Sequence, residues 1–66
     1  MPITGLDLRA ERRRNEITAT EIANRMGLSR ATIHTLEKSA VITVERELQY
    51  RRALSDAIVA ARERVA

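Results

Sequence analysis

Residues 29–38, which read SRATIHTLEK, combine cations with short hydroxyl side chains on one predicted helix. On a helix, residues three and four positions apart share a face, so Ile33 and Leu36 both point inward. The opposite face then carries Arg30, Ala31, Thr32, His34, Thr35 and Lys38. Small hydrogen-bonding groups flanked by cations suit an anionic, grooved partner, and this stretch is therefore predicted to be a DNA recognition helix.

The predicted recognition helix reads base edges with some side chains and holds phosphates with others. The guanidinium of Arg30 can donate two hydrogen bonds to guanine. The candidates for base contacts are Arg30, Ala31, His34 and Thr35, and those for phosphate contacts are Arg13, Thr18, Ser29, Thr32 and Lys38. Alternatives stay open for four residues. Arg30 could be a phosphate contact or a free surface residue, Ala31 a small spacer, His34 a solvated side chain, and Lys38 a cation matched to the helix dipole.

Residues that support catalysis or metal binding are few. The chain has no cysteine and one histidine, His34, whereas a zinc site needs several such ligands. There is no glycine-rich phosphate loop, and the carboxylates lie among Arg and Lys residues on expected helix surfaces. We therefore expect no enzyme activity, no metal and no cofactor.

Size and composition predict one small helical domain over residues 1–66. The core must be built from Ile, Leu, Val, Met and Ala, because the chain has no Phe or Trp and a single Tyr. Such a chain is close to the lower limit for folding alone. The net charge of +3 is compatible with nucleic acid. Without a long apolar run or a segment typical of a signal peptide, we expect a cytoplasmic protein that does not enter the membrane.

A first helix is predicted over residues 4–15. Thr4 can cap its N-terminus, Asp7 complements the helix dipole in the first turn, and Leu8 is its clearest core residue. Asn15 is expected to end the helix in a left-handed conformation. The arginines of its last turn either match the dipole or contact phosphate, and these are Arg12, Arg13 and Arg14.

Two further helices are predicted to follow in close succession. Thr18 and Glu21 fit a capping box at the start of the second helix. Gly27 can end this helix with a positive φ, and Ser29 can cap the third helix only two residues later. Short helices joined by so tight a turn cross steeply, which predicts a helix-turn-helix over about residues 18–38.

The remaining chain predicts a loop and a long C-terminal helix over about residues 43–64. Residues 40–44 (AVITV) favour β structure, but without a partner strand a loop with buried anchors is favoured over a short strand. Val44 and Leu48 are the early apolar positions of the helix. A second apolar series either forms a dimer interface or covers the chain's own core, and it comprises Tyr50, Leu54, Ile58, Ala61 and Val65.

Residues 17–37 resemble the helix-turn-helix of the Cro- and phage-repressor-like family, often called XRE-like. The resemblance rests on the spacing of one glycine, one glutamate and several apolar residues, namely Ala23, Gly27, Leu28, Ile33, Leu36 and Glu37. It extends over about residues 8–54. It implies an all-α, compact, lambda-repressor-like domain of four to five helices. It also implies an ion pair between Arg12 and Glu37 that locks the first helix to the third.

Four positions depart from the family pattern. Ala19 stands where the family usually has a phosphate-binding Gln. Glu16 and Ser39 each replace a Gly, and Ile42 replaces a Pro. The departures affect the expected phosphate contact and the loop geometry, and they leave the core pattern intact.

The resemblance implies a transcriptional regulator, a repressor of phage or prokaryotic type, that binds double-stranded DNA. Because one small domain reads only a few base pairs, we expect a homodimer on a palindromic operator. No small-molecule effector is expected. The alternative is a protein-interaction module, antitoxin-like or adaptor-like, that keeps the fold without the DNA contact. Ala19 favours this alternative, and the retained polar face of residues 30–38 argues against it.

Overall fold

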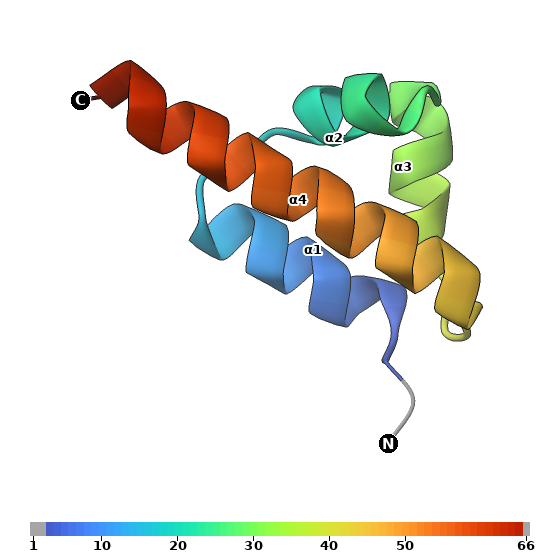
Figure 1. The fold of residues 1–66 in the computed structure, drawn as a ribbon. Coiled ribbons are helices and arrows are strands. Elements are labelled where there is room, and N and C mark those ends of the chain that lie inside the picture. The colour runs from blue at the N-terminus through green and yellow to red at the C-terminus, as the bar shows by residue number, and fades with distance from the viewer. Residues whose placement is uncertain (1–2, 66) are drawn as a thin grey trace.

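The computed structural model describes residues 3–65, and the side chains of residues 3–64, as an all-α chain. The helices are α1 (Gly5–Arg14), α2 (Ala19–Met26), α3 (Arg30–Glu37) and α4 (Val44–Val65). Within residues 3–65 there is no strand. Figure 1 shows the long α4 running across the molecule with α1 below it, α2 above it and α3 on the right. α2 packs against both α3 and α4, and α1 packs against the same two helices. The expectation of a compact, all-helical chain is confirmed.

A side-chain hydroxyl accepts from a backbone amide at the start of each of the four helices, and these hydroxyls belong to Thr4, Thr18, Ser29 and Thr43. The hydroxyl of Thr4 accepts from the Asp7 amide, and the Asp7 carboxylate accepts from the Thr4 amide at 2.9 Å, which completes a capping box. At α2 the hydroxyl of Thr18 accepts from the Glu21 amide at 3.1 Å. The Glu21 side chain does not return to the cap but pairs with Arg25, so only half of the expected box forms.

The turns after α1 and α2 are built in the same way. After α2, Gly27 has φ of 70°, and the Leu28 amide donates to the carbonyl of Ala23. After α1, the left-handed residue is Glu16, with φ of 58°, whereas Asn15 has φ of −94°. The prediction for Asn15 is wrong by one position, because a Schellman motif places the left-handed residue one beyond the cap.

The loop between α3 and α4 contains no strand and only one clear anchor. Ile42 is partly buried and packs against the core, whereas Val41 is 84% exposed. Ser39, which stands where the related family has Gly, keeps a negative φ and donates its hydroxyl to the carbonyl of Thr35 at 3.0 Å. A glycine is therefore not needed at this helix end.

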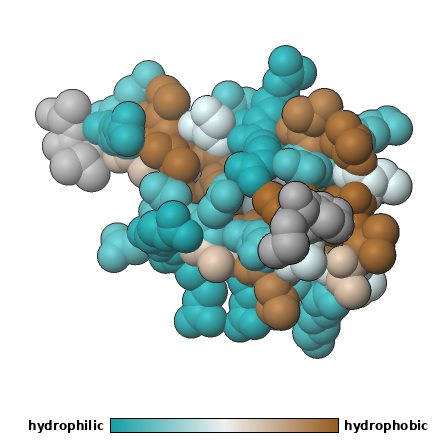
Figure 2. All heavy atoms as spheres, turned by 90° about the horizontal axis from the view of Figure 1, so that it is seen from below, coloured by the Kyte–Doolittle hydropathy of each residue, from teal (hydrophilic) through white to brown (hydrophobic). Residues whose placement is uncertain are grey.

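The core is formed by aliphatic residues from all four helices and by the single tyrosine. Its buried residues are Leu8, Ile17, Ala19, Ile22, Ala23, Ile33, Tyr50, Ala53, Leu54 and Ala57. The face seen in Figure 2 is largely hydrophilic, with separate apolar areas between the polar side chains. None of the described helices combines the length and the apolar character that crossing a membrane requires.

Two of the residues predicted as dimer-interface candidates lie inside the molecule. Tyr50 is fully buried and Leu54 is 4% exposed, so neither is available to a partner. Ile58 and Ala61 are partly buried and pack against the same core. The side chain of Val65 lies outside the described residues. This face of α4 therefore covers the chain's own core. The apolar spacing could not decide between the two alternatives, because the same spacing fits a dimer interface and intramolecular packing.

Candidate nucleic-acid interface

The two sides of α3 differ sharply in burial. On the inner side Ile33 is fully buried and Glu37 is 1% exposed, and Leu36 is partly buried. The side chains on the outer side are all exposed, and they are Arg30, Ala31, Thr32, His34, Thr35 and Lys38. The structure therefore brings all four candidates for base contacts, together with Thr32 and Lys38, onto one continuous face.

Two hydroxyl groups lie at the N-terminal end of this face. The Ser29 hydroxyl accepts from the Thr32 amide at 3.1 Å and lies 2.9 Å from the Thr32 hydroxyl. This cap orients both side chains at the start of α3, where the helix dipole favours an anion. A phosphate oxygen at this point would find positive potential and hydroxyl donors together.

The hydroxyl of Thr35 has a restricted role because it bonds to its own helix. It donates to the carbonyl of Ala31 at 3.1 Å, which uses its single hydrogen. The lone pairs of the oxygen stay available, so Thr35 can accept from an exocyclic amine of adenine or cytosine. His34, beside it, is exposed to solvent.

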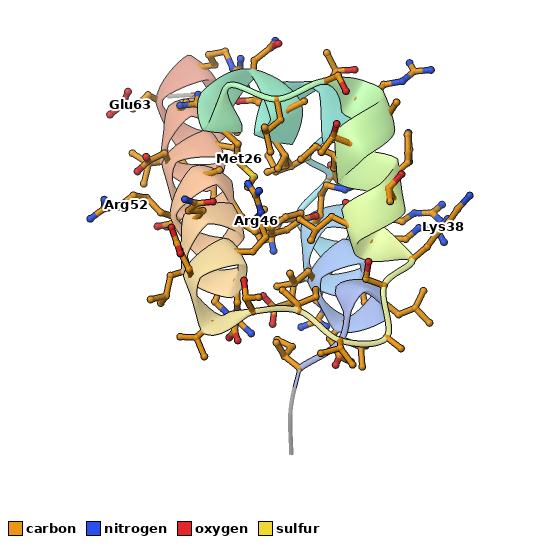
Figure 3. All side chains as sticks on the ribbon, turned by 90° about the vertical axis from the view of Figure 1, so that its right-hand side faces the viewer. Met26, Lys38, Arg46, Arg52 and Glu63 are labelled. Atoms are coloured by element: carbon orange, nitrogen blue, oxygen red, sulfur yellow. The ribbon has the colours of Figure 1, made fainter. Side chains whose placement is uncertain are left out.

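Positive charge lies at the two ends of the outer face. Arg30 is in the first turn of α3 and Lys38 directly follows its last turn. Neither forms an ion pair within residues 3–65. Lys38 points away from the body of the molecule in Figure 3. The only carboxylate of the helix, that of Glu37, is turned into the core, so the outer face carries no negative side chain.

The remaining phosphate candidates lie on other elements. Thr18 caps α2 and is exposed, and Arg13 is exposed in the last turn of α1. Ala19, which replaces the Gln of the related family, is only 7% exposed. Its side chain therefore packs in the core, and the surface beside Thr18 carries the ion pair of Glu21 and Arg25 instead.

A buried ion pair fixes α3 to α1. Arg12 Nε lies 2.7 Å from Glu37 Oε2, and Arg12 Nη2 lies 3.0 Å from Glu37 Oε1, so the guanidinium and the carboxylate meet at two points. Arg12 also donates to the carbonyl of Ile17 at 2.9 Å. Tyr50 of α4 donates its hydroxyl to Glu37 Oε2. These contacts hold the inner side of α3 to two other helices and to the turn before α2.

The protonation state of the network follows from its contacts. Burial acts to raise the pKa of Glu37, but the hydrogen bonds from Arg12 and Tyr50 outweigh it, so this pKa lies below its ordinary value. Burial and the hydrogen bond to Glu37 raise the pKa of Tyr50 above its ordinary value. Glu37 is therefore ionised and Tyr50 neutral at neutral pH.

Sequence reasoning missed two features of this site. It grouped Tyr50 with the second apolar series of the last helix. A lone aromatic hydroxyl in an aliphatic core needs a hydrogen-bond partner, and this need was the available signal. It also missed Gly5, whose amide donates to the carbonyl of Ser39 at 2.9 Å. A Cβ at Gly5 would lie 2.7 Å from the carbonyl oxygen of Glu37. No local sequence pattern predicts that the backbone at Gly5 lies so close to the end of α3.

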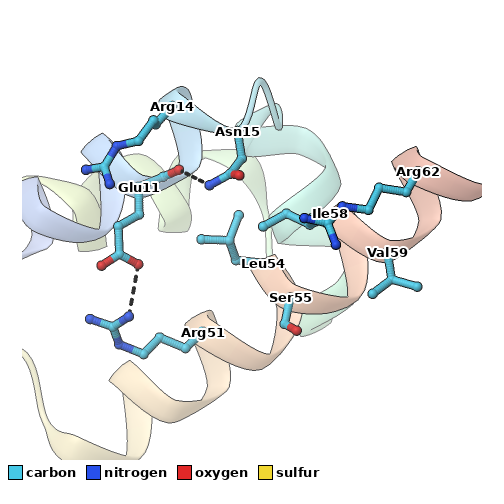
Figure 4. A pocket seen from close by; sticks show the side chains of 9 residues that line it. All are labelled: Glu11, Arg14, Asn15, Arg51, Leu54, Ser55, Ile58, Val59 and Arg62. Atoms are coloured by element: carbon cyan, nitrogen blue, oxygen red, sulfur yellow. Dashed lines mark hydrogen bonds and ion pairs between the residues drawn. The ribbon is translucent and has the colours of Figure 1, made fainter. Parts of the chain in front are cut away.

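A shallow hollow between α1 and α4 is lined by charged and apolar side chains (Figure 4). Its charged members include Arg14 and Arg62, and its apolar floor includes Leu54 and Ile58. Its one carboxylate, that of Glu11, pairs with Arg51 at 2.9 Å. Within residues 3–65, acidic and histidine side chains do not gather in threes at spacings suited to a metal ion.

Comparisons with protein-family models, with curated proteins and with solved structures found no match to this chain.

Proposed function

We propose that the chain is a sequence-specific DNA-binding regulator whose α3 enters the major groove. In this proposal α2, the turn at Gly27 and α3 act as a helix-turn-helix. The chain binds an operator as a repressor of the XRE-like kind, consistent with the resemblance of residues 17–37. Its action is occupation of the operator rather than chemistry.

The observation that carries the proposal is the outer face of α3. It presents six exposed residues, two of them unpaired cations and two of them threonines, while its one carboxylate is turned inward. An exposed helix face that carries only positive and neutral hydrogen-bonding groups matches both the phosphate charge and the base edges of DNA.

The size and rigidity of α3 also support the proposal. The eight residues of α3 form a helix about 12 Å long, and the diameter of an α-helix with its side chains, about 10–12 Å, fits the roughly 12 Å width of the major groove. The contacts of Glu37 with Arg12 and Tyr50 hold the inner side of the helix, so the backbone from which its outer side chains extend is fixed in position. Fixed positions reduce the entropy lost on binding and favour discrimination between sequences.

The test is selection of bound duplexes from a random pool, followed by titration of the winning sequence. Arg30→Ala is expected to weaken binding by about 1–3 kcal/mol and to relax the preference at one base pair. Arg62→Ala, which removes the same charge from the far end of α4, is the matched control and should change binding little. Loss of affinity without loss of base preference would assign Arg30 to phosphate.

Salt dependence separates phosphate contacts from base contacts. Lys38→Ala is expected to weaken binding to all sequences alike and to reduce the slope of log affinity against log salt by about one. A pool that stays random after selection, with weak and salt-sensitive binding alone, would refute sequence-specific recognition. That outcome would favour the protein-interaction module.

A further inference from the structure

The hollow between α1 and α4, drawn in Figure 4, has no role in the proposed function. α1 lines it with three residues spaced three and four positions apart, and α4 lines it with one stripe from Arg51 to Arg62. That stripe extends about 16.5 Å, or three turns, along the helix. The volume of the hollow is about 460 Å³, within the range of roughly 300–1,000 Å³ that is common for binding sites. The hollow is therefore an elongated groove with a helix as each wall.

The hollow has an apolar centre and a polar rim. Its apolar side chains come from α4, and they are those of Leu54, Ile58 and Val59. Leu54 is already covered by the chain itself, but Ile58 is only partly buried and Val59 is 49% exposed. Polar groups of Asn15 and Ser55 lie beside them. An apolar centre within a polar rim is the usual anatomy of a protein–protein interface.

The hollow carries an excess of positive charge. Its one carboxylate, that of Glu11, is paired with Arg51 at 2.9 Å. Arg14 and Arg62 are exposed, and among the described side chains neither takes part in an ion pair. Two cations thus remain without a counter-ion, and they favour a partner that carries carboxylates.

The positions of these two cations select an elongated partner. In Figure 4, Arg14 and Arg62 lie at opposite ends of the hollow, with Leu54 and Ser55 between them. A compact anion such as phosphate can reach only one of the two guanidinium groups. A partner with a carboxylate near each end reaches both, while its middle covers the apolar centre.

The walls of the hollow determine which conformation of peptide fits it. Addition of a strand requires an unpaired sheet edge, and residues 3–65 contain no strand. Recognition of a proline-rich segment requires aromatic side chains, and none lines the hollow. A groove between two helices does accept the apolar face of a third helix. The partner segment is therefore helical.

We propose that the hollow between α1 and α4 binds an amphipathic helix of another protein. The apolar face of this helix packs on Ile58 and Val59, and its carboxylates pair with Arg14 at one end and Arg62 at the other. No residue of α3 lines the hollow, so the outer face of α3 stays accessible. The inference goes beyond the proposed function and does not depend on it, because the two surfaces belong to different helices.

Selection from a peptide library provides the first test. The probe is a phage-displayed library of helical peptides of about 15 residues, long enough to form a helix and randomised on one face, presented to the immobilised full chain. Enriched sequences are expected to combine apolar residues three and four positions apart with Asp or Glu towards both ends. Circular dichroism should show that the winning peptide gains helix on binding. A library without enrichment, or a winner that binds without forming a helix, overturns the inference.

Charge exchange with the winning peptide provides the second test, measured by fluorescence anisotropy. Arg14→Glu and Arg62→Glu each turn an attraction into a repulsion and should raise Kd at least about tenfold. Arg52→Glu is the matched control, because Arg52 is exposed on α4 and does not line the hollow. It should change Kd by less than about threefold, since exposed charges at a distance are screened. Equal losses in Arg62→Glu and Arg52→Glu contradict the proposed contact.

A peptide with the opposite charge at one end makes this test reciprocal. Lys in place of the acidic residue that meets Arg62 should weaken binding to the parent chain. The same peptide should bind Arg62→Glu with a Kd within about threefold of the original pair, because the attraction is restored in reverse. Absence of this rescue shows that no ion pair forms at Arg62.

An apolar-to-charged variant tests the centre of the hollow. Val59→Asp places a carboxylate among the apolar side chains and should abolish binding of the winning peptide. Val44→Asp is the matched control, because Val44 is 71% exposed on the same helix and lies outside the hollow. It should leave binding intact. Circular dichroism establishes that each variant retains its helices, and equal losses in the two variants overturn the inference.

The outcomes separate this inference from the proposed function. Arg62→Glu that loses the peptide and still selects the parent's DNA sequence shows two independent sites. If the library gives no winner and the chain still selects one DNA sequence, the inference fails and the proposed function stands. A peptide that obeys the charge exchange, in a chain that selects no DNA sequence, supports the inference and refutes the proposed function.

Discussion

Tyr50 donates a hydrogen bond to Glu37, the same carboxylate that Arg12 holds through two nitrogen atoms. One buried oxygen, Glu37 Oε2, thus accepts from both α1 and α4 while its own residue belongs to α3. In the described side chains no buried polar atom lacks a partner. The side chains of Arg12, Glu37 and Tyr50 therefore join three helices, and removal of any one of them leaves a buried charge or hydrogen-bonding group without that partner.

Removal of one member of this network is expected to destabilise the fold in a graded way. Glu37→Ala leaves the buried Arg12 without a counter-ion, and a loss of about 3–5 kcal/mol follows. Tyr50→Phe removes a single hydrogen bond to a charged group, so a loss of about 2 kcal/mol is expected. Urea unfolding curves measure both losses. A Glu37→Ala variant as stable as the parent would show that the ion pair contributes nothing.

The same network predicts how stability depends on pH. The pKa of Glu37 is lower in the folded chain than in the unfolded chain, so its contribution is present at neutral pH and is lost as pH falls below about 4. The pKa of Tyr50 is higher in the folded chain, so its contribution is lost as pH rises above about 10. The free energy of unfolding, measured at a series of pH values for the parent and for Tyr50→Phe, tests the loss of stability at alkaline pH. If the free energy of unfolding fell equally in both proteins above about pH 10, Tyr50 would be excluded as the cause.

Much of the fold was predictable because its signals are local. The caps at Thr4, Thr18 and Ser29 and the stop at Gly27 depend on neighbours within three residues, and the structure forms each of them. The spacing of the early apolar positions of α4 did not decide whether they face the core or solvent. Val44 and Leu48 fit the periodicity of a helix, yet they face solvent, because helical spacing does not say which side of a long helix meets the core.

The outer face of α3 could be predicted from the sequence, whereas the buried contacts that hold α3 in place could be predicted only in part. The alternation of Ile33 and Leu36 with polar residues was enough to separate the two sides of the helix. The contact of Glu37 with Tyr50 joins residues on different helices, and the tyrosine could not be located before the path of α4 was known. Non-local contacts of this kind depend on how helices cross rather than on composition.

Replacement of Gly5 separates helix propensity from packing. In an exposed helix, Gly→Ala stabilises by about 1 kcal/mol. At Gly5 we expect the opposite sign, a loss of about 2 kcal/mol or more, because the new Cβ would meet the backbone carbonyls of Leu36 and Glu37. Gly27→Ala is the control, since it has open space but a left-handed backbone, and should cost about 1–2 kcal/mol. A thermal melt in which Gly5→Ala is more stable than the parent would contradict the close approach of α1 to the end of α3.

The turn after α1 offers a stabilising substitution at Glu16. This residue is exposed and holds φ of 58°, a conformation that costs an L-residue about 1 kcal/mol and a glycine almost nothing. Glu16→Gly is therefore expected to raise stability by about 0.5 kcal/mol, after the greater freedom of glycine in the unfolded chain is allowed for. Asn15→Gly is the matched control. Asn15 has a negative φ and donates its side-chain amide to the carbonyl of Glu11 at 2.8 Å, so its replacement should lower stability. Urea unfolding of the two variants measures the difference, and the reverse order would place the left-handed residue at Asn15.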